Sequence, residues 1–462
     1  MYHYFYIEAI DKAKIKGTIA YITPNTFLTL GSKLVLRKRL QGNRLIEIVN
    51  VGYVFDSAFV DTTIVVMNKE PLGNLNYSFK YKNAINSFKK PETYSAKIEL
   101  YRASLNNIFF TPNSTNLSIY HRLNPHLNKL YKTYWELIED TKSRQKNISV
   151  LNNYCDNLNE TDLTFLGLIT EGAQGLVTGN NSKYLAIICN SEEEELKILR
   201  LLVNKLLIEG VLIEHDVNLR NKNIFYELAE KLKKDTGKPS LFGKFFLYKT
   251  VRYTDVIDFE SLSLEEQLNG CEREVWVNYN RGNENGYKWY VPHVECIKWH
   301  KATVKELREA TVTNSRWQGA NYYNTSGFGW VDYFTNDLKG FFIEPCPYSK
   351  NVVKMHSVSR ISDKYILALL NSKFGTYYIK NFITTTHTLQ INDGKLFPII
   401  TDETYKKELE DLVDKVLTLK SSNETSSIKN IEKKINSIVY KIYNLTLEET
   451  RVVDSEYLYI EK

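Results

Sequence analysis

The sequence predicts an α/β protein in which a short run of helices and strands is followed by an α+β region and a helical tail. Three observations predict this class. Apolar runs rich in β-branched residues at 18–24 (TIAYITP) and 62–68 (TTIVVMN) are typical of buried strands. A helical pattern precedes the first run, which indicates alternating helices and strands. Near the other end, residues 403–420 and 428–445 have the apolar spacing of two amphipathic helices.

The elements of the first seventy residues can be placed in order. Residues 2–16 read as a helix that ends at Gly17, just before the first strand. The basic segment 30–43 reads as a second helix, and 45–52 (LIEIVNVG) as a second strand. About ten residues without a helical pattern join this strand to the third, 62–68, so we expect these two strands to pair antiparallel.

The rest of the chain is more mixed. Residues 123–145 form an amphipathic helical pattern, and a new unit begins near Leu163 with a glycine-containing loop followed by a strand. Residues 192–236 are helical and highly charged. Residues 270–400 carry five of the six tryptophans and read as a region of strands and loops.

Charge is unevenly distributed. Of 60 Lys and Arg and 54 Asp and Glu, residues 1–150 hold 21 and 11, a net charge of +10. The remainder, 39 against 43, has a net charge of −4. A basic N-terminal third suits a polyanionic partner, but a lysine-rich solvated surface explains the charge equally well. Composition therefore leaves both interpretations open.

Several classes of protein are excluded. Hydrophobic residues make up 43% of the chain, which is the composition of a folded protein. The length of 462 residues suggests two or three domains. No run approaches the ~20 apolar residues of a membrane helix, so no membrane partner is expected. The five cysteines form no CxxC pair and the eight histidines no ligand pair, so we expect no metal and a reducing, cytoplasmic location. No phosphate loop, HExxH or GxSxG motif occurs.

Four parts of the sequence resemble one family. Residues 17–67 contain TPNTFL, then a basic helix, a strand, VFDSAFVDT and a further strand. This order resembles the adenine-N6 DNA methyltransferases, and most closely the TaqI-like enzymes, the fused type IIG restriction–modification proteins and the methyltransferases of BREX phage-defence systems. The other parts that resemble this family, in the family's order, are 169–181, 315–399 and 433–453.

The resemblance implies a fold and a division of the chain. Residues 1–70 would be the C-terminal half of a Rossmann-like methyltransferase sheet, holding its fifth to seventh strands. Residues 71–162 would be a connecting region and 163–400 an α+β target-recognition domain. Residues 401–462 would be a helical tail. The implied function is site-specific methylation of adenine N6 in double-stranded DNA, within a restriction–modification or phage-defence system.

Two motifs of the family are missing. The sequence has no glycine-rich loop before residue 17 to bind S-adenosylmethionine, and no Asn-Pro-Pro-Tyr turn to hold the adenine amine. The nearest string is Asn124-Pro125-His126, in a helical context. We therefore expect no cofactor-binding residue in this chain, and S-adenosylmethionine only with a complementing methyltransferase half. The alternative is a non-catalytic DNA-specificity subunit that docks on a separate methyltransferase chain.

The resemblance also implies residues for the target base. A methylated base must leave the helical stack, and an aromatic ring then covers one face of it. In the family this ring lies in the loop after the sixth strand, which is Phe55 here, with Phe59 nearby. The alternative for Phe55 is a core residue that plugs the end of the sheet. Asn25 follows a strand at its carboxyl end, where it could line the pocket or merely cap the next helix.

Residues for DNA contact are expected in two places. A basic strip on and after the second helix could lie on phosphates, or be an ordinary solvated face: Arg37, Lys38, Arg39 and Arg44. In the recognition region, some polar and aromatic side chains have the chemistry of base contacts: Gln174, Thr178, Asn181, Arg316, Trp317 and Gln318. The glycines at 172, 175 and 179 favour the alternative of a tight turn whose polar residues satisfy one another.

Overall fold

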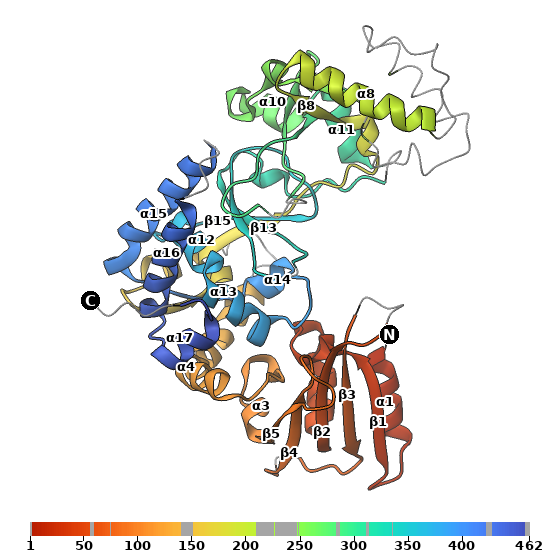
Figure 1. Cartoon of the computed structure of the whole chain (residues 1–462), viewed down its shortest axis with the longest axis vertical. Helices are drawn as coiled ribbons and strands as arrows, with labels where there is room; N and C mark the ends of the chain where they lie inside the picture. The colour runs from red at the N-terminus through yellow and green to blue at the C-terminus, as the bar shows by residue number, and fades with distance from the viewer. Residues whose placement is uncertain are drawn as a thin grey trace.

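A computed structural model of the protein shows a mixed α/β fold, the class that the sequence predicts. The chain curves into a crescent, with a five-stranded sheet at one end, a lobe built around α8 at the other, and a helical layer along the outer side (Figure 1). No helix in the described part of the chain is long and apolar enough to cross a membrane. The structure describes residues 2–55, 60–73, 75–139, 151–208, 226, 247, 249–282, 287–310, 314–334, 336–421 and 427–457.

The first sheet has the strand order β1-β3-β2-β4-β5. Strand β3 is antiparallel to both β1 and β2, which confirms the predicted pairing of the second and third strands. Strand β4 runs parallel to β2 and antiparallel to β5. The bounds are β1 (Thr18–Pro24), β2 (Arg44–Tyr53), β3 (Asp61–Asn68), β4 (Ser78–Asn83) and β5 (Glu92–Lys97).

Three helices pack on this sheet: α1 (Tyr2–Lys12), α2 (Leu34–Gln41) and α3 (Ile98–Arg102). Helix α1 ends four residues earlier than predicted, and Lys16 takes a positive φ of 65° in the turn that follows it. The predicted boundary at residue 70 is wrong, since β4 and β5 extend the same sheet to residue 97. Pro71 and Gly73 suggested a domain break, but they only form the connection to β4.

Two further sheets make up the recognition region. One has the order β14-β13-β15-β7 and the other β10-β11-β12-β8-β9, and a common core of buried side chains lies between them. The strands are β7 (Thr170–Gln174), β8 (Leu185–Cys189), β9 (Thr250–Arg252), β10 (Val256–Ile257), β11 (Trp276–Tyr279), β12 (Glu295–Lys298), β13 (Gly327–Val331), β14 (Gly340–Ile343) and β15 (Val352–Ser357). Their helices are α7 (Asn181–Tyr184), α8 (Glu192–Ile208), α10 (Leu264–Asn269) and α11 (Lys301–Glu309).

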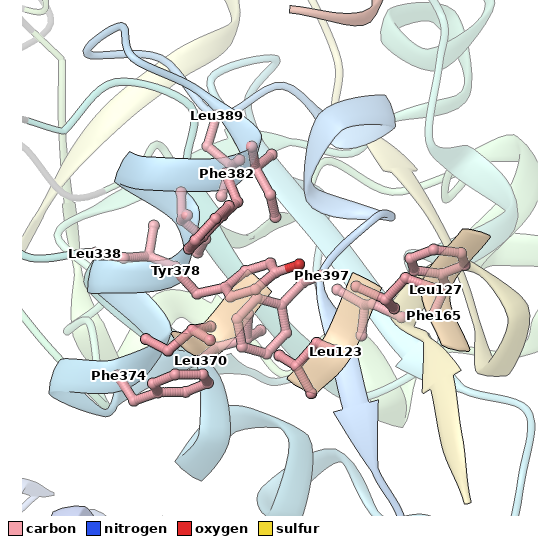
Figure 2. Packing of buried hydrophobic residues seen from close by; sticks show 14 of the residues in the cluster. Leu123, Leu127, Phe165, Leu338, Leu370, Phe374, Tyr378, Phe382, Leu389 and Phe397 are labelled. Atoms are coloured by element: carbon pink, nitrogen blue, oxygen red, sulfur yellow. The ribbon is translucent and has the colours of Figure 1, made fainter. Parts of the chain in front are cut away.

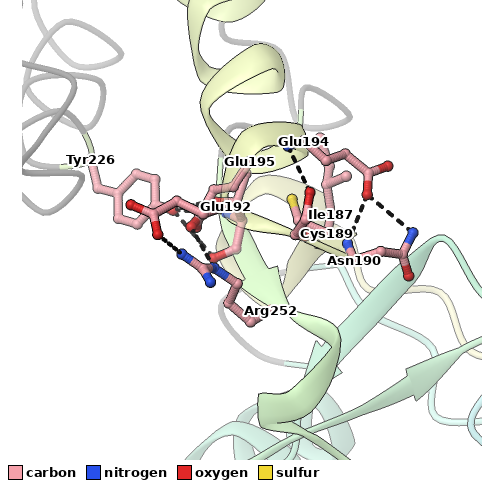
Figure 3. Close-up of polar contacts among 10 residues, drawn as sticks. Ile187, Cys189, Asn190, Glu192, Glu194, Glu195, Tyr226 and Arg252 are labelled. Carbon is pink, nitrogen blue, oxygen red and sulfur yellow. Dashed lines mark hydrogen bonds and ion pairs between the residues drawn. The ribbon is translucent and has the colours of Figure 1, made fainter.

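Helix α8 begins with four consecutive glutamates, and two of them anchor it to β9 (Figure 3). Glu195 accepts hydrogen bonds from the Thr250 hydroxyl at 2.7 Å and from Arg252 Nε at 3.1 Å. Glu192 lies 3.4 Å from the same guanidinium. Acidic side chains also suit the positive N-terminal end of a helix. The negative charges at the start of α8 therefore help to fix the helix against β9. The predicted helix over 192–236 is confirmed as far as residue 208, and nearly all of its remainder lies outside the described residues.

The remaining helices form one layer with a shared core. They are α4 (Ser114–Glu139), α6 (Leu166–Ile169), α12 (Asp363–Asn371), α13 (Lys373–Tyr378), α14 (Ile391–Gly394), α15 (Glu403–Ser421), α16 (Ile428–Ile442) and α17 (Leu447–Val453). Figure 2 shows Tyr378 against Phe397, with Leu123 of α4 and Phe374 beside them. The two helices predicted for the tail are confirmed as α15 and α16.

The predicted recognition domain, 163–400, is not one unit. Its last part, from Ile361 onwards, belongs to the buried cluster of the first sheet and the tail, which also takes in side chains of β13 and β15 such as Trp330 and Met355. A second buried cluster of the recognition sheets runs from Leu176 to Val352. The two ends of the range also meet, because β6 (Leu163–Phe165) pairs antiparallel with β16 (Pro398–Ile400). The recognition sheets are thus an insertion between two segments that belong to the central layer.

Candidate functional site

The carboxyl ends of three strands meet at one edge of the first sheet. Strands β1 and β2 both run antiparallel to β3, so they point the same way, and β4 runs parallel to β2. A glycine shapes this edge, since Gly52 has a φ of +67° at a register shift that follows Asn50. Ligands of α/β sheets bind at the carboxyl ends of the strands, so this edge is the candidate site.

A row of polar side chains crosses the sheet near this edge. Asn50 of β2 is paired with Thr63 of β3 on one side and with Asn83 of β4 on the other. Thr63 is in turn paired with Thr23 of β1, and Asn83 with Glu92 of β5. Residues paired in register place their side chains on the same face. This polar row therefore spans all five strands.

A cavity of about 420 Å³ opens at this edge, and two members of the polar row, Asn50 and Asn83, line it. It is within the size range of small-molecule sites, roughly 300–1,000 Å³. Its aromatic walls include Tyr81, and burial raises the pKa of that phenol to about 12, so it stays neutral. The lining residues are Asn25, Asn50, Asp61, Tyr81, Asn83, Ile85, Phe109, Phe110, Thr111, Lys380, Asn381, Thr384, Thr385, Thr386 and His387.

The segment 384–388 (TTTHT) closes one side of the cavity and joins two parts of the molecule. Toward the first sheet, the Thr385 backbone N–H donates to Thr29 Oγ1 at 3.0 Å, and His387 Nε2 lies 3.4 Å from a carboxylate oxygen of Asp61. Toward the recognition sheets, the backbone N–H of Phe334 donates to the carbonyl oxygen of His387 at 2.8 Å. An occupant of the cavity would contact a segment held by both parts.

Asn25 lies at this cavity. The residue is 3% exposed and donates its amide to the carbonyl oxygen of Thr385 at 3.5 Å. It does not cap the following helix, because Pro24 occupies the N-cap position and no side chain caps that turn. The capping interpretation of Asn25 is therefore wrong, and its amide bounds the cavity.

Phe55 stands beyond the end of β2 and is 44% exposed. Two residues before it, Tyr53 is paired in register with Asp61, which lines the cavity. A ring exposed to this degree does not plug the sheet, so the core interpretation of Phe55 is wrong. Phe59, its neighbour in the sequence, lies outside the described residues.

Only part of the predicted basic strip is exposed, and two of its arginines are paired with acidic side chains. Lys38 and Arg39 are exposed, but Arg39 pairs with Asp11 at 2.6 Å. Arg44 makes a two-point contact with Glu70, with Nε at 2.6 Å and Nη2 at 3.3 Å. These partners reduce the positive charge available for phosphates.

For Arg37 the prediction of a DNA contact is wrong. The residue is fully buried on the inner face of α2. Its Nη1 donates to the backbone carbonyl oxygens of Phe27 at 2.9 Å and Leu30 at 2.7 Å, and its Nε to that of Asn106 at 2.9 Å. Burial lowers the pKa of the guanidinium to about 10, so it remains charged at neutral pH. Arg37 organises the backbone under the sheet.

In the recognition region, the glycine segment is a tight structural turn. A side chain at position 175 would collide with the carbonyl oxygen of Tyr348, and Gly179 has a φ of +69°. Thr178 is 3% exposed and donates its hydroxyl to the side chain of Asn181. The prediction that Thr178 contacts a base is therefore wrong, and the structure follows the alternative of a self-satisfied turn.

The remaining candidates divide by exposure. Arg316 is exposed, and its backbone pairs with Val177 in an isolated bridge. Trp317 instead packs into the core, stacked on Trp299 with ring centroids 5.9 Å apart.

Gln318 and Gln174 meet at the same turn. Gln318 donates its amide to the carbonyl oxygen of Gly175 at 2.7 Å, which makes it part of the turn and contradicts its assignment as a base contact. Gln174 is half-buried at the end of β7, paired with Val353. Base contact stays a prediction for Gln174, Asn181 and Arg316.

Of the residues that line the cavity, only Asn25 was predicted from the sequence. Asn50 is a polar residue near the carboxyl end of the strand 45–52, which also contains Glu47, and an asparagine at that end was a usable signal. Asn83 lies on a strand that was not predicted. The run of threonines in 384–388 is unusual in the sequence, but its place against the first sheet depends on packing between residues more than 300 positions apart.

Comparisons with known proteins give limited matches. No protein-family model and no curated protein matches this chain. Among solved structures, the type IIL restriction–modification enzyme MmeI in complex with DNA superposes with a TM-score of 0.46 and 9% identity, over 97% of this chain and 51% of MmeI. The type IIG restriction endonuclease BpuSI superposes with a TM-score of 0.27 and 12% identity, over 96% of this chain and 49% of BpuSI.

The chain thus spans about half the length of these two proteins. TM-scores at this level do not establish a shared fold. The case for a function therefore rests on the chain's own residues.

Proposed function

We propose that this chain is the C-terminal portion of a site-specific DNA methyltransferase that modifies adenine N6, in a restriction–modification or phage-defence system. One observation carries the proposal. The exposed Phe55 stands at the same strand edge as a cavity lined by carboxamides and aromatic rings. The resemblance of residues 17–67 to the family supports it, because VFDSAFVDT, whose counterpart in the family holds the ring that covers the target base, begins at this edge, as does TPNTFL.

The chemistry fits an extruded base. Methylation of a base amine requires the base to leave the duplex, which exposes both of its faces at a cost of a few kcal/mol. Phe55 offers an exposed ring to one face, and the neutral amide of Asn25 bounds the neighbouring cavity. The transfer step needs a methyl donor held close to the amine, and this chain's part is to bind and orient the base.

S-adenosylmethionine supplies the methyl group in this family, and the described residues do not fit it. Among the described residues, no glycine-rich turn follows a strand at the carboxyl edge of the first sheet. The cavity there is lined by asparagines, threonines and aromatic side chains. The cofactor site therefore belongs to a complementing half, and no step through the cofactor is assigned to residues of this chain.

The first sheet has a place for such a half. Strand β1 is the last strand on its side of the sheet, with β3 as its partner. Its outward-facing Ile22 is 45% exposed, and Ile15, just before it, is 63% exposed. An edge strand with apolar neighbours can add a strand of another chain through backbone hydrogen bonds. The complementing half would extend the sheet from β1.

The test is a methylation assay on the assembled enzyme. The tagged chain is purified from its own cells with bound proteins and incubated with S-adenosylmethionine and duplex DNA. The DNA is then digested to nucleosides for mass spectrometry. We expect N6-methyladenine from the complex and none from the chain alone. A complex that binds DNA at a specific site without methylating adenine would support the alternative of a DNA-specificity subunit.

A further inference from the structure

We infer that Asn50 is a specificity-determining residue that hydrogen-bonds the edge of an adenine held in the 420 Å³ cavity. This inference rests on the proposed function and deepens it, because it names the residue that reads the base. Two buried polar atoms in the polar row support it.

The side-chain oxygens of Asn50 and Thr63 are buried without a hydrogen-bond partner in the described part of the chain. Asn50 is 5% exposed and Thr63 fully buried. Most buried polar atoms in proteins are paired, and an unpaired one destabilises the fold. These two lie side by side across β2 and β3, so the unsatisfied positions are adjacent. Of the two, Asn50 lines the cavity, where a ligand would complete the bonding of its side-chain oxygen.

The cavity lining indicates what the ligand offers. Four carboxamides face it: Asn25, Asn50, Asn83 and Asn381. Its aromatic side chains are Tyr81, Phe109 and Phe110, which suit a flat ring. A carboxamide presents one acceptor and one donor side by side, which matches the amine and neighbouring ring nitrogen of adenine.

Other ligand classes fit less well. A phosphate would bring only acceptor atoms to the unpaired Asn50 oxygen, which is itself an acceptor. A metal ion needs several charged ligands, and no group of His, Cys, Asp or Glu in the described part of the chain could hold one. Of the acidic side chains at the cavity, Asp61 already faces His387 at 3.4 Å.

The position of Asn50 connects it with Phe55. Both residues stem from β2, with Phe55 just past its end and Asn50 three residues before its last residue, Tyr53. A base that leaves the duplex would meet the exposed Phe55 ring first and present its hydrogen-bonding edge to Asn50 deeper in. Phe55 stacks on any base, whereas Asn50 selects by hydrogen bonding, so the two side chains have separable roles.

The experiment measures binding of free adenosine to the full chain by saturation-transfer NMR, with cytidine as the competing nucleoside. Asn50→Leu removes both hydrogen-bonding atoms at similar volume. Asn68→Leu is the matched control, because Asn68 ends β3 at the opposite edge of the sheet. We expect adenosine to bind the unaltered chain and the control alike, and Asn50→Leu to bind it about tenfold more weakly. Cytidine should bind less well than adenosine.

The melting temperature separates recognition from structure. Removal of an unpaired buried oxygen should leave the melting temperature of Asn50→Leu unchanged or raise it, whereas a structural role for Asn50 predicts a fall. Equal adenosine binding by Asn50→Leu and the unaltered chain, equal binding of both nucleosides, or no adenosine binding at all would each overturn the inference. The methylation assay described above tests the proposed function independently. If the chain binds adenosine selectively but the complex does not methylate adenine, the proposed function is contradicted and the inferred role of Asn50 is still supported.

Discussion

The buried guanidinium of Arg37 donates to the backbone carbonyl oxygen of Asn106 at 2.9 Å, which ties helix α2 to the turn after α3. Two more carbonyl oxygens depend on the same side chain. We predict that Arg37→Ala lowers the free energy of unfolding by about 3 kcal/mol, because three backbone acceptors, one of them fully buried, lose their donor. Urea unfolding measures this, with the exposed neighbour variant Lys38→Ala expected to match the unaltered chain. Loss of DNA affinity with unchanged stability would contradict the structural role.

Phe55 should act on the base and leave the fold unaffected. Phe55→Ala removes one stacking face, worth about 1–3 kcal/mol, or roughly 5- to 150-fold in productive binding. Phe55→Trp should retain most of the effect, since any aromatic face can stack. The measurement is 2-aminopurine fluorescence at the target position of DNA bound to the assembled enzyme, together with the melting temperature. A large fall in melting temperature in both variants would show that the ring is structural after all.

Stability should respond to the ionisation of Asp393. Burial raises the pKa of this carboxyl from 3.8 to about 6, so the folded state holds the proton more tightly than the unfolded state. The contribution of the protonated Asp393 carboxyl to the free energy of unfolding is complete below about pH 4 and is lost as the pH rises through 6. Asp393→Asn should therefore be about 3 kcal/mol more stable than the unaltered chain at pH 8 and equal to it near pH 4. Urea unfolding at both pH values checks this, and a constant difference would refute it.

The open edge of β1 should be needed for association and unnecessary for DNA binding. Ile22→Lys places a charge on this edge strand, which disfavours the addition of another strand. We expect it to reduce recovery of the complementing half in co-purification, with the DNA affinity of the chain unchanged. Val35→Lys is the control, since Val35 is 71% exposed on α2. Equal loss in both variants would show a general effect of charge.

The sequence was informative where signals are local. It predicted β1 from its β-branched residues, with bounds identical to those observed, and α15 and α16 from apolar spacing. Arg37 was misplaced because charge suggested a surface, although its position next to Leu36 and one turn before Leu40 puts it on the buried face of the helix. Strands β4 and β5 were missed because their residues are largely polar and half exposed.

The site was harder to predict than the fold elements. Asn25 was found because it follows a strand, and Phe55 because its position matches the loop in which the resembling family places its aromatic ring. To predict the cavity, one would need to know the register of β2 against β3 and β4. One would also need to know that the segment 384–388, far along the chain, packs against the first sheet. Neither is encoded in local periodicity, because both depend on which strands and segments pack together.

The central claim, that this chain reads a DNA site containing an adenine, is tested most directly by selection from a pool of random duplexes with the purified chain. The account predicts enrichment of one discrete sequence with an adenine at a fixed position. Binding should weaken as salt rises, because phosphate contacts release counterions, while the sequence preference persists. Binding without any enriched sequence, or an enriched sequence without a fixed adenine, would contradict the claim.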